Sequence, residues 1–494
     1  MSDLPARPLS ALGLNPSRGG NVRVTGIGLD SRALQKGMLF AALPGSRVHG
    51  ATYIATALAR GAHAILTDRA GAEIAGEALA ASDAALVLAE DPRAALSGAA
   101  ALWFGAQPAV MAAVTGTNGK TSVASFTRQI WAALGHDAAN LGTTGVEGAY
   151  SAPLGHTTPD SITLHRLLAD MAHEGVTHCA MEASSHGLDQ RRLDGVTLRA
   201  AGFTNFSQDH LDYHQTMDAY FAAKALLFER VLPEDGVAVL NMDDPYGADL
   251  LAIAEARGLG TLTIGRDPDA DIRLLGQRFD AAGQVLRFGY DGATFQQTLP
   301  LIGGFQAENV LVAYGLVLAC GADPAEAAAQ LSRLDGVRGR MQIAGRRANG
   351  ASVFVDYAHT PDALAVALQA LRPHVMGRLV VVFGAGGDRD RGKRPLMGAA
   401  AAQHADVVFV TDDNPRTEAA DAIRAEILQA CSNATEVADR AEAILRGVDA
   451  LGPGDALLIA GKGHETGQIV GETVYPFDDL EQASLAIAAL EERA

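Results

Sequence analysis

The sequence predicts an α/β protein of three domains with mainly parallel sheets. A length of 494 residues fits about three domains at roughly 150 residues each. Short runs of Val, Ile, Leu and Phe alternate almost throughout with longer Ala-rich segments of helical period, which is the pattern of parallel strands covered by helices. The clearest expected strands are residues 64–67, 85–88, 109–114, 237–240, 352–355, 379–383, 407–410 and 456–459.

Two breaks divide the chain. Ala106-Gln-Pro precedes a strand that leads into a Gly-rich loop, and the Gly/Arg-rich stretch 334–340 precedes a fresh strand. We therefore expect an N-terminal α/β domain at residues 1–106, a central domain at residues 107–340 and a C-terminal domain at residues 341–494.

The charge balance restricts the class of partner. Lys and Arg number 39 and Asp and Glu number 57, so the net charge is −18. This balance argues against a protein that binds nucleic acid by neutralising phosphates, because nothing offsets the repulsion from a polyanion. It leaves room for a small anionic substrate held in a local basic pocket.

Membrane and secreted classes are not expected. The longest apolar stretch, residues 310–322, is short of the roughly 18 residues that a membrane-spanning helix needs. The N-terminal residues contain no apolar segment of the signal-peptide kind. Cys179, Cys320 and Cys431 are far apart without CxxC spacing, which predicts reduced, buried thiols and no zinc site. A cytoplasmic enzyme without membrane insertion is the expectation.

Residues 109–122 carry the strongest local signal. An apolar strand leads into the Gly-rich turn Thr115-Gly-Thr-Asn-Gly-Lys-Thr121, and apolar residues then recur at helical spacing until Gly135. Turn amides and a helix N-terminus would cradle phosphates, with Lys120 reaching the β- and γ-phosphates and the Thr121 hydroxyl binding Mg²⁺. The candidate nucleotide-binding residues are Gly116, Thr117, Asn118, Gly119, Lys120, Thr121 and Ser122.

The spacing departs from the standard P-loop at one point. Val114 stands where that pattern has its first glycine, and the first glycine here is Gly116. An ordinary strand-to-helix turn is the alternative, but a Gly-Lys-Thr sequence between strand and helix favours nucleotide binding.

Acidic residues end two further expected strands. Glu182 ends the strand that starts near Thr177, and Asp209 and His210 follow the strand near Gly202. A carboxylate in such a place holds Mg²⁺ directly or through water, or else is a solvated strand end or helix cap. Their common position after the phosphate loop favours the metal-binding interpretation.

Lys224 lies in a helix, residues 217–228, that is apolar on most faces. One interpretation is a lysine whose stem is buried while its head reaches water. The other is a desolvated, neutral amine of lowered pKa, which would capture CO₂ as a carbamate and so become a metal-binding anion. The residues alone leave both open.

Three loops of the C-terminal part follow expected strands. Residues 383–394 are dense in guanidinium groups, Thr411-Asp-Asn-Pro-Arg416 presents Arg416 after a turn, and Ala460-Gly-Lys-Gly-His-Glu465 offers backbone amides and a carboxylate. Arginine forks bind carboxylates in a bidentate way. Three such loops predict a crevice at the carboxyl edge of one sheet that suits a carboxylate-bearing substrate.

Several of these motifs together resemble the Mur ligases of peptidoglycan synthesis, in the same order and over nearly the full length. They are Thr115-Gly-Thr-Asn-Gly-Lys-Thr121, Met181-Glu-Ala-Ser-Ser-His186, Asp209-His-Leu-Asp-Tyr-His214, Asp356-Tyr-Ala-His-Thr-Pro361 and Gly461-Lys-Gly-His-Glu465. The resemblance implies a UDP-substrate domain at residues 1–106, a P-loop-type ATPase domain at residues 107–340 and a Rossmann-like amino-acid-binding domain at residues 341–494. It implies a ligase that uses ATP and Mg²⁺.

The resemblance also implies roles for individual residues. Lys224 matches the family's carbamylated lysine, which with Thr121, Glu182 and His210 would organise Mg²⁺, and Lys120, Glu182, His210 and Lys224 are the candidate catalytic residues. The residues implied to contact the UDP part and the muramoyl dipeptide are Leu29, Ser31, Ser46, Arg47, Val48, Thr157, Thr158, Ser184, Gln190 and Arg192. Those implied to contact ATP where the domains close are Asn309, Arg340, Asp356 and His359.

The acceptor amino acid follows from one motif. Asp413-Asn-Pro-Arg416 is identical to the motif of the diaminopimelate-adding members of this family, whereas lysine-adding members differ at the arginine position. Diaminopimelate has a second amino-carboxylate centre that lysine lacks, and Arg416 would pair with its carboxylate. The acceptor residues are then expected to be Arg389, Asp413, Asn414, Pro415, Arg416, Gly461 and Glu465.

The expected substrates are UDP-N-acetylmuramoyl-L-alanyl-D-glutamate, meso-diaminopimelate and ATP, handled by a monomer. Ser122 and His156 stand where many members have Thr and Asn, and the second departure weakens position 156 as a substrate contact. A lysine-adding Mur ligase and a folylpolyglutamate synthase-like ligase share the ATPase core and are alternatives. A P-loop kinase and a non-catalytic nucleotide-binding regulator are the alternatives from other classes.

Overall fold

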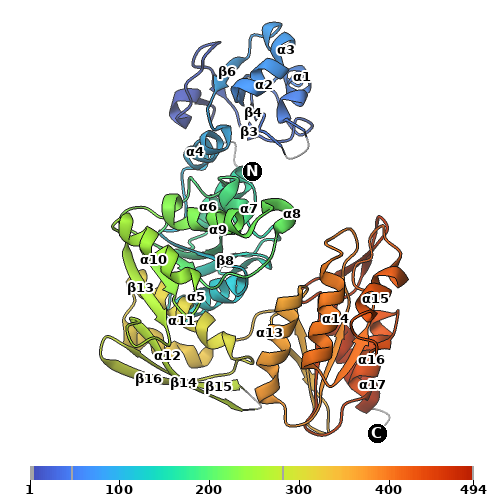
Figure 1. Cartoon of the computed structure of the whole chain (residues 1–494). Coiled ribbons are helices and arrows are strands. Elements are labelled where there is room, and N and C mark those ends of the chain that lie inside the picture. The colour runs from blue at the N-terminus through green and yellow to red at the C-terminus, as the bar shows by residue number, and fades with distance from the viewer. Residues whose placement is uncertain (1–4, 46–47, 281–282, 492–494) are drawn as a thin grey trace.

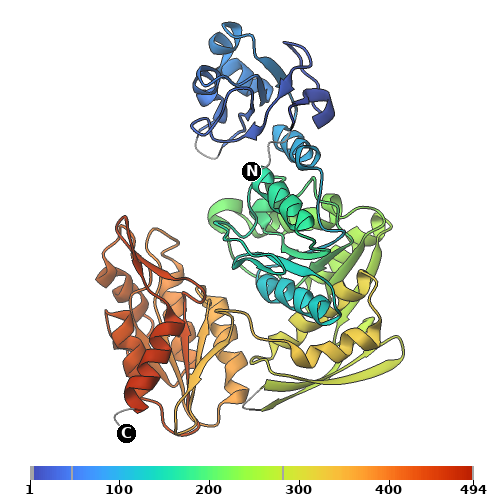
Figure 2. The same cartoon turned by 180° about the vertical axis from the view of Figure 1, so that it is seen from behind.

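The computed structural model describes residues 5–45, 48–280 and 283–491. Figure 1 shows three bodies: an N-terminal domain at the top, a central domain below it, and a C-terminal domain beside the lower half of the central one. The view from behind shows the same arrangement (Figure 2). Each body holds its own sheet, and the α/β class predicted from the sequence is confirmed.

The N-terminal domain is built on a parallel sheet of strand order β3-β4-β5-β6. Its strands are β3 (Ile27–Gly28), β4 (Leu39–Ala41), β5 (Ala64–Thr67) and β6 (Ala85–Leu88), beside a small pair β1 (Arg7–Pro8) and β2 (Arg23–Val24). Its helices are η1 (Leu9–Leu12), η2 (Gly50–Tyr53), α1 (Ile54–Ala59), α2 (Arg69–Ile74), α3 (Gly76–Ala80) and α4 (Pro92–Phe104). Helix α4 starts from the Asp91 cap and ends at Gly105, whose φ is 71°.

The central domain has a large, mainly parallel sheet of order β16-β15-β14-β13-β12-β11-β7-β10-β8-β9. Its parallel strands are β7 (Val110–Thr115), β8 (Ala138–Gly142), β10 (His178–Glu182), β11 (Ala200–Phe203), β12 (Val237–Asn241), β13 (Gly260–Gly265) and β14 (Ile272–Asp280). Antiparallel β9 (Gly145–Gly148), β15 (Gly283–Tyr290) and β16 (Ala293–Leu299) complete its edges.

Helices cover both faces of the central sheet, which is why its inner strands read as continuous apolar runs. One face packs on α5 (Lys120–Ala133), α11 (Phe305–Ala319), α12 (Pro324–Gln330) and η4 (Leu331–Arg333). The other packs on α6 (Ser161–His173), α7 (Ser185–Asp189), α9 (Met217–Leu226), η3 (Leu227–Val231) and α10 (Tyr246–Ala256), with α8 (Leu211–His214) beside α9.

The C-terminal end of helix α5 lies where the sequence pattern predicts it. The helix stops where Gly135 takes a φ of 91°. The N–H of Gly135 donates to the carbonyl of Ala132, and the N–H of His136 donates to that of Trp131. These are the two hydrogen bonds of a Schellman motif, for which the left-handed glycine is required. The helix stop expected at Gly135 is therefore confirmed.

The C-terminal domain has a sheet of order β17-β18-β22-β19-β20-β21, parallel except at β17. Its strands are β17 (Gln342–Arg346), β18 (Ser352–Asp356), β19 (Leu379–Phe383), β20 (Val407–Val410), β21 (Thr435–Glu436) and β22 (Ala456–Ala460), and a hairpin is formed by β23 (Gly467–Val470) and β24 (Thr473–Pro476). Helices α13 (Pro361–Leu371), α14 (Lys393–His404) and α15 (Ala420–Leu428) pack on one face, and α16 (Arg440–Asp449) and α17 (Asp479–Glu491) on the other; η5 (Arg372–His374) follows α13.

A buried ion pair ties α16 and α17 to the carboxyl edge of this sheet. The Arg440 guanidinium donates to both carboxylate oxygens of Asp479 at 2.7 Å, and both side chains are fully buried. The same guanidinium donates to the carbonyl of Ala460 at 2.9 Å, the last residue of β22. The pair therefore fixes the point at which the loop after β22 begins.

Few segments join the three bodies. Arg191 pairs with Asp91 at the N-terminus of α4, and α4 packs on α6. Between the central and C-terminal domains, His374 of η5 donates to the carbonyl of Asp280 and accepts from the N–H of Gly303. Within the described residues, helices long and apolar enough to cross a bilayer are absent.

Candidate active site

The turn between β7 and α5 forms a tight loop against its neighbours. Gly116 and Gly119 have φ of 144° and 86°, which favour glycine. A Cβ on Gly116 would lie 1.9 Å from the Thr204 hydroxyl, and a Cβ on Gly119 would lie 2.3 Å from the amide oxygen of Asn309. Asn309 is thus beside the loop, as its expected role in binding ATP requires.

Two residues that the sequence analysis did not single out brace this loop. The Thr204 hydroxyl donates to the carbonyl of Asn118 at 2.6 Å, and the Asn205 amide oxygen accepts from the N–H of Asn118 at 2.9 Å. The N–H of Thr117 donates to the carbonyl of Asn205. Both residues directly follow β11, the strand beside β7. Their polar character at that position was the available signal.

Lys120 and Lys224 converge on one carbonyl. Lys120 Nζ donates to the carbonyl oxygens of Gly116 and Thr117 at 2.9 and 2.8 Å. Lys224 Nζ, on α9, donates to the same Gly116 oxygen at 2.6 Å and lies 4.4 Å from the centre of the Tyr220 ring. The side chain of Lys224 is 1% exposed, so the interpretation with a head in water is wrong.

The environment favours the neutral form of Lys224. Burial lowers the pKa of its amine well below the ordinary value, the neighbouring Lys120 cation lowers it further, and the Asp209 carboxylate opposes both. Burial also lowers the pKa of Lys120, against the carboxylates of Glu182 and Asp209. A buried, neutral amine is the chemical form that reacts with CO₂.

Glu182 ends β10, on the other side of β7, and is 1% exposed. Its carboxylate accepts from the N–H of Thr143 at 2.7 Å and from the Thr143 hydroxyl at 3.2 Å. His210, after β11, takes a φ of 51°, and burial lowers the pKa of its imidazole to about 4, so the ring is neutral near pH 7. The Thr121 hydroxyl accepts from Arg340 at 3.3 Å.

The side chains expected to hold the metal fit Mg²⁺ if Lys224 is carbamylated. Clusters of three or more His, Cys, Asp or Glu able to hold a metal are absent from the described ranges. The expected set contains two such residues, Glu182 and His210, together with the Thr121 hydroxyl and Lys224. Conversion of Lys224 to a carbamate supplies the further anionic oxygen donors that a hard cation prefers, in place of an amine nitrogen.

The residues expected at the dipeptide lie side by side. The Thr158 hydroxyl donates to the carbonyl of Glu182 and accepts from the N–H of Ser184. The Arg192 guanidinium donates to the carbonyl of Thr158 and, at 2.8 Å, to the amide oxygen of Gln190. The Thr157 hydroxyl meets that of Thr143 at 3.0 Å.

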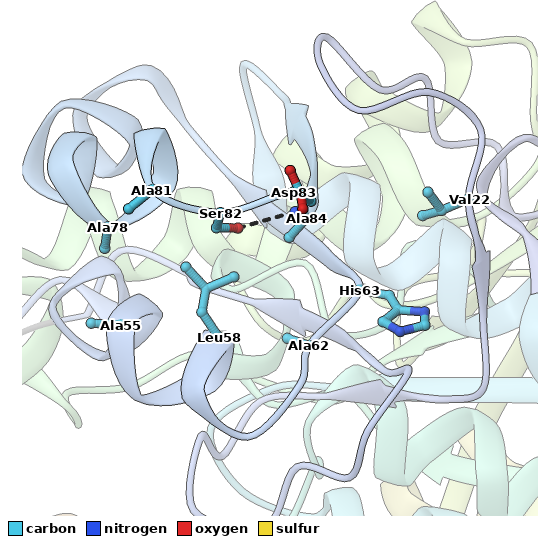
Figure 3. Close-up of a pocket in the computed structure, with 10 residues that line it drawn as sticks. All are labelled: Val22, Ala55, Leu58, Ala62, His63, Ala78, Ala81, Ser82, Asp83 and Ala84. Atoms are coloured by element: carbon cyan, nitrogen blue, oxygen red, sulfur yellow. Dashed lines mark hydrogen bonds between the residues drawn. The ribbon is translucent and has the colours of Figure 1, made fainter.

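The expected uridine-side residues follow the carboxyl ends of β3 and β4. Leu29 is half-buried, Ser31 is buried and Val48 is exposed, whereas Ser46 and Arg47 lie outside the described residues. A separate hollow of about 670 Å³, lined by Leu58, Ala62, His63 and Ala84 among others, opens at the amino ends of β5 and β6 (Figure 3). Ligands of parallel sheets bind at the carboxyl edge, so this hollow is not the expected uridine site.

The linker between the central and C-terminal domains runs past the phosphate loop. Besides reaching Thr121, the Arg340 guanidinium lies 4.7 Å from the centre of the Tyr357 ring. Asp356, at the end of β18, accepts from the N–H groups of Met341 and Ala358 at 2.6 and 2.8 Å. Burial lowers the pKa of His359, which faces the Lys393 cation and the Asp209 carboxylate. The structure thus brings Asn309 and Arg340 against the phosphate loop, whereas Asp356 and His359 lie on the C-terminal side, near Arg340.

The three loops expected to bind the acceptor follow β20, β19 and β22, which are neighbours in one sheet. Arg389 is exposed, and a Cβ on Gly386 would lie 2.9 Å from Arg416 and 3.8 Å from Arg389, so both flank this glycine. Arg416 has a φ of 50° and donates to the carbonyl of Gly387 at 2.8 Å. Its backbone N–H donates to the carbonyl of Ile469 in β23, and its carbonyl accepts from the N–H of Gly471, directly after that strand.

The remaining residues expected to bind the acceptor form a compact group. Asn414 donates to Glu465 Oε2 at 2.9 Å, and a Cβ on Gly461 would lie 2.7 Å from the carboxylate of Asp413. Pro415 is buried, and its carbonyl lies against Gly387. The group therefore has the Arg416 guanidinium and the stem of Arg389 beside Gly386, and the Glu465 carboxylate beside Asn414.

Two arginines of segment 383–394 pair with carboxylates of the protein itself, although this segment was expected to bind a substrate carboxylate. Arg394 is fully buried and pairs with Glu418 and Glu426, and Arg391 pairs with Glu426. The expectation that this whole loop offers guanidinium groups to a substrate is wrong for both, because acidic side chains of α15 and the preceding turn neutralise them.

Family comparisons agree with this geometry. Three models match the chain: "Mur ligase family, catalytic domain" at residues 23–103, "Mur ligase middle domain" at residues 114–317, and "Mur ligase, glutamate ligase domain" at residues 339–463. The chain belongs to the Mur ligase family.

Relatives of this Mur ligase match over nearly their whole length. The UDP-N-acetylmuramoyl-L-alanyl-D-glutamate–2,6-diaminopimelate ligase of Bradyrhizobium diazoefficiens is 52% identical over 474 residues, covering 95% of this chain and 96% of its own. A solved structure of an enzyme of that name is 34% identical, with a TM-score of 0.72 and coverage of 98% and 99%. MurF ligase from Thermotoga maritima in complex with ADP shares the fold, with 20% identity, a TM-score of 0.63 and coverage of 95% and 98%.

Gly116→Ala tests the phosphate loop of this Mur ligase. The added methyl group would clash with Thr204. An alanine at the positive φ of this position would also be strained, which costs about 1–3 kcal/mol from the backbone alone. We expect ATP affinity, measured by calorimetry, to fall by about tenfold or more. Gly98→Ala is the matched control, because a Cβ there meets nothing within 4 Å. Unchanged affinity in Gly116→Ala would contradict a role of this turn in nucleotide binding.

Proposed function

We propose that this Mur ligase joins meso-diaminopimelate to the D-glutamate γ-carboxylate of UDP-N-acetylmuramoyl-L-alanyl-D-glutamate, with ATP as co-substrate, in cytoplasmic synthesis of peptidoglycan precursors. The observation that carries the proposal is the acceptor group, in which Arg416 and Arg389 flank Gly386 while Glu465 lies beside Asn414. Such a site matches the carboxylate and ammonium of an amino-acid centre. The names of the relatives support the same substrate.

The central domain would bind ATP and Mg²⁺. Residues 116–122 present backbone N–H groups and the N-terminus of α5 to the phosphates, with Asn309, Arg340, Asp356 and His359 closing from the linker side. Thr121, Glu182, His210 and the Lys224 carbamate would hold Mg²⁺. When bound, Mg²⁺ would neutralise phosphate charge and align the phosphoryl group.

Different residues of the chain act in phosphoryl transfer, in binding of the UDP-dipeptide and in binding of diaminopimelate. Lys120 leaves its carbonyl partners and neutralises the phosphoryl group that passes from ATP to the γ-carboxylate, giving an acyl phosphate and ADP. Thr157, Thr158, Ser184, Gln190 and Arg192 hold the dipeptide, and Leu29, Ser31, Ser46, Arg47 and Val48 hold the UDP part. Arg389, Asp413, Asn414, Pro415, Arg416, Gly461 and Glu465 orient diaminopimelate for attack on the acyl carbon, which expels phosphate.

In this proposal each of the three domains binds one substrate. We propose that residues 1–106 take the UDP part, residues 107–340 take ATP, and residues 341–494 take the amino acid, in a monomer. Closure of the domains would align the three substrates and exclude water, which otherwise hydrolyses an acyl phosphate.

The function is tested by the dependence of ADP release on both other substrates. With purified protein, we expect ADP and free phosphate to form only when the UDP-dipeptide and meso-diaminopimelate are both present. Phosphate retained on a product would identify a kinase, and absence of turnover would identify a binding protein. Equal use of lysine or of a folate substrate would replace the diaminopimelate assignment.

Lys224→Ala tests the carbamate. We expect the variant to lose activity by about 100-fold or more, since a charge-stabilising group in the site is removed. Short carboxylates should restore part of the activity. Removal of CO₂ should slow the natural enzyme, yet leave the carboxylate-rescued variant unchanged. Lys36→Ala, on the exposed surface of the N-terminal domain, is the control. Full activity of Lys224→Ala in CO₂-free buffer would show that the lysine has only a structural role.

Arg416→Ala tests acceptor recognition. Truncation of a charged partner of a substrate carboxylate costs about 2–5 kcal/mol, so kcat/KM for diaminopimelate should fall by about 30-fold or more. Turnover with lysine, which lacks that carboxylate, should change far less. Arg391→Ala is the matched control, because its guanidinium pairs with Glu426. A loss no larger with diaminopimelate than with lysine removes the basis for the acceptor assignment.

A further inference from the structure

Lysine is rare in this chain, and its positions are informative. The sequence has 39 basic residues, of which five are lysines: Lys36, Lys120, Lys224, Lys393 and Lys462. Lys36 is exposed. The other four donate to acceptors that follow the strands of the two large sheets. A chain that uses arginine nearly everywhere else has lysine where a compact ammonium, rather than a planar guanidinium, fits.

Lys462 is the one fully buried lysine to which neither the motifs nor the proposed mechanism gives a task. It lies two residues after β22, and its side chain is 0% exposed. Lys462 Nζ donates to Glu465 Oε2 at 3.0 Å and to the amide oxygen of Asn414 at 3.1 Å. It therefore touches two of the residues expected to bind the acceptor amino acid.

These contacts fix the orientation of both partners. Because the Asn414 amide oxygen accepts from Lys462 and from the N–H of Ile469, its amide nitrogen points to Glu465 Oε2, to which it donates at 2.9 Å. Glu465 Oε2 thus receives two donors. In the part of the chain that the structure describes, no hydrogen bond reaches the other oxygen, Oε1, and the Glu465 side chain is 32% exposed.

The charges explain why this arrangement is retained. A buried ammonium without a partner is very costly, so Lys462 needs the Glu465 carboxylate. Among the described residues, the carboxylate in turn keeps one oxygen without a hydrogen bond, on a side chain that is 32% exposed. An ammonium of an amino acid is a suitable donor to that oxygen.

We infer that Lys462 is a positioning residue for the acceptor: it holds Glu465 Oε2 and Asn414 so that Glu465 Oε1 receives the ammonium group of diaminopimelate. The inference rests on the proposed function. Lys462 touches no substrate itself and acts through Glu465.

The test is the split of the kinetic constants in Lys462→Met, which keeps the length of the side chain and removes its charge. We expect KM for diaminopimelate to rise by at least tenfold. KM for ATP and for the UDP-dipeptide should stay within twofold, and kcat within threefold. Lys462→Gln, which keeps a donor, should show a smaller rise in KM for diaminopimelate, and it decides the question if the methionine variant does not fold. Lys36→Met is the control and should change none of these constants.

A double variant separates positioning from general structural damage. If Lys462 acts through Glu465, adding Lys462→Met to Glu465→Gln should raise KM for diaminopimelate by less than twofold beyond Glu465→Gln alone. Additive effects, an unchanged KM for diaminopimelate in both Lys462 variants, or an equal rise for all three substrates would overturn the inference. If the natural enzyme does not turn over diaminopimelate at all, the proposed function fails and this inference fails with it.

Discussion

The parallel pairing of β7 with β10 and β11 is the constraint on which the phosphate-loop side of the site depends. Parallel strands end at the same edge, so the phosphate loop, Glu182 and the Thr204–His210 segment must meet there. The loop is shaped by that crowding, because Gly116 is pressed against Thr204 and its carbonyl receives both Lys120 and Lys224. The C-terminal sheet repeats the principle, with β22, β19 and β20 as neighbours that place the acceptor loops side by side.

The local sequence pattern was sufficient to predict several strands, the phosphate loop and the end of α5. The expected strands 64–67, 85–88, 379–383 and 407–410 have the bounds of β5, β6, β19 and β20, because each is a short, mainly apolar run. The phosphate loop and the end of α5 were also readable from sequence, since both depend on glycines at fixed positions. Such signals are carried by neighbouring residues and need no knowledge of the tertiary structure.

The binding partners of polar and charged side chains could not be predicted from the local sequence. Arg389 and Arg394 stand in one arginine-rich segment and look alike in sequence. Yet the first is exposed in a loop beside Arg416, and the second, in the first turn of α14, is buried between Glu418 and Glu426. Likewise, the tasks of Lys462 and Asn205 follow from contacts with segments 48 and 87 residues away along the chain. Residue type limits what a side chain can bind, and only the fold decides which partner is within reach.

The linker connects the two halves of the site physically. Arg340 contacts Thr121 of the phosphate loop and the ring of Tyr357, and Tyr357 lies 5.0 Å from the ring of His464 in the acceptor loop. The preceding Gly339 is packed so closely that a Cβ would lie 2.2 Å from the backbone nitrogen of His464. Three consecutive linker residues, Gly339, Arg340 and Met341, therefore touch the acceptor loop, the phosphate loop and the end of β18. Because both loops share these contacts, a shift of the C-terminal domain cannot leave the phosphate loop unaffected unless the Arg340 contact breaks.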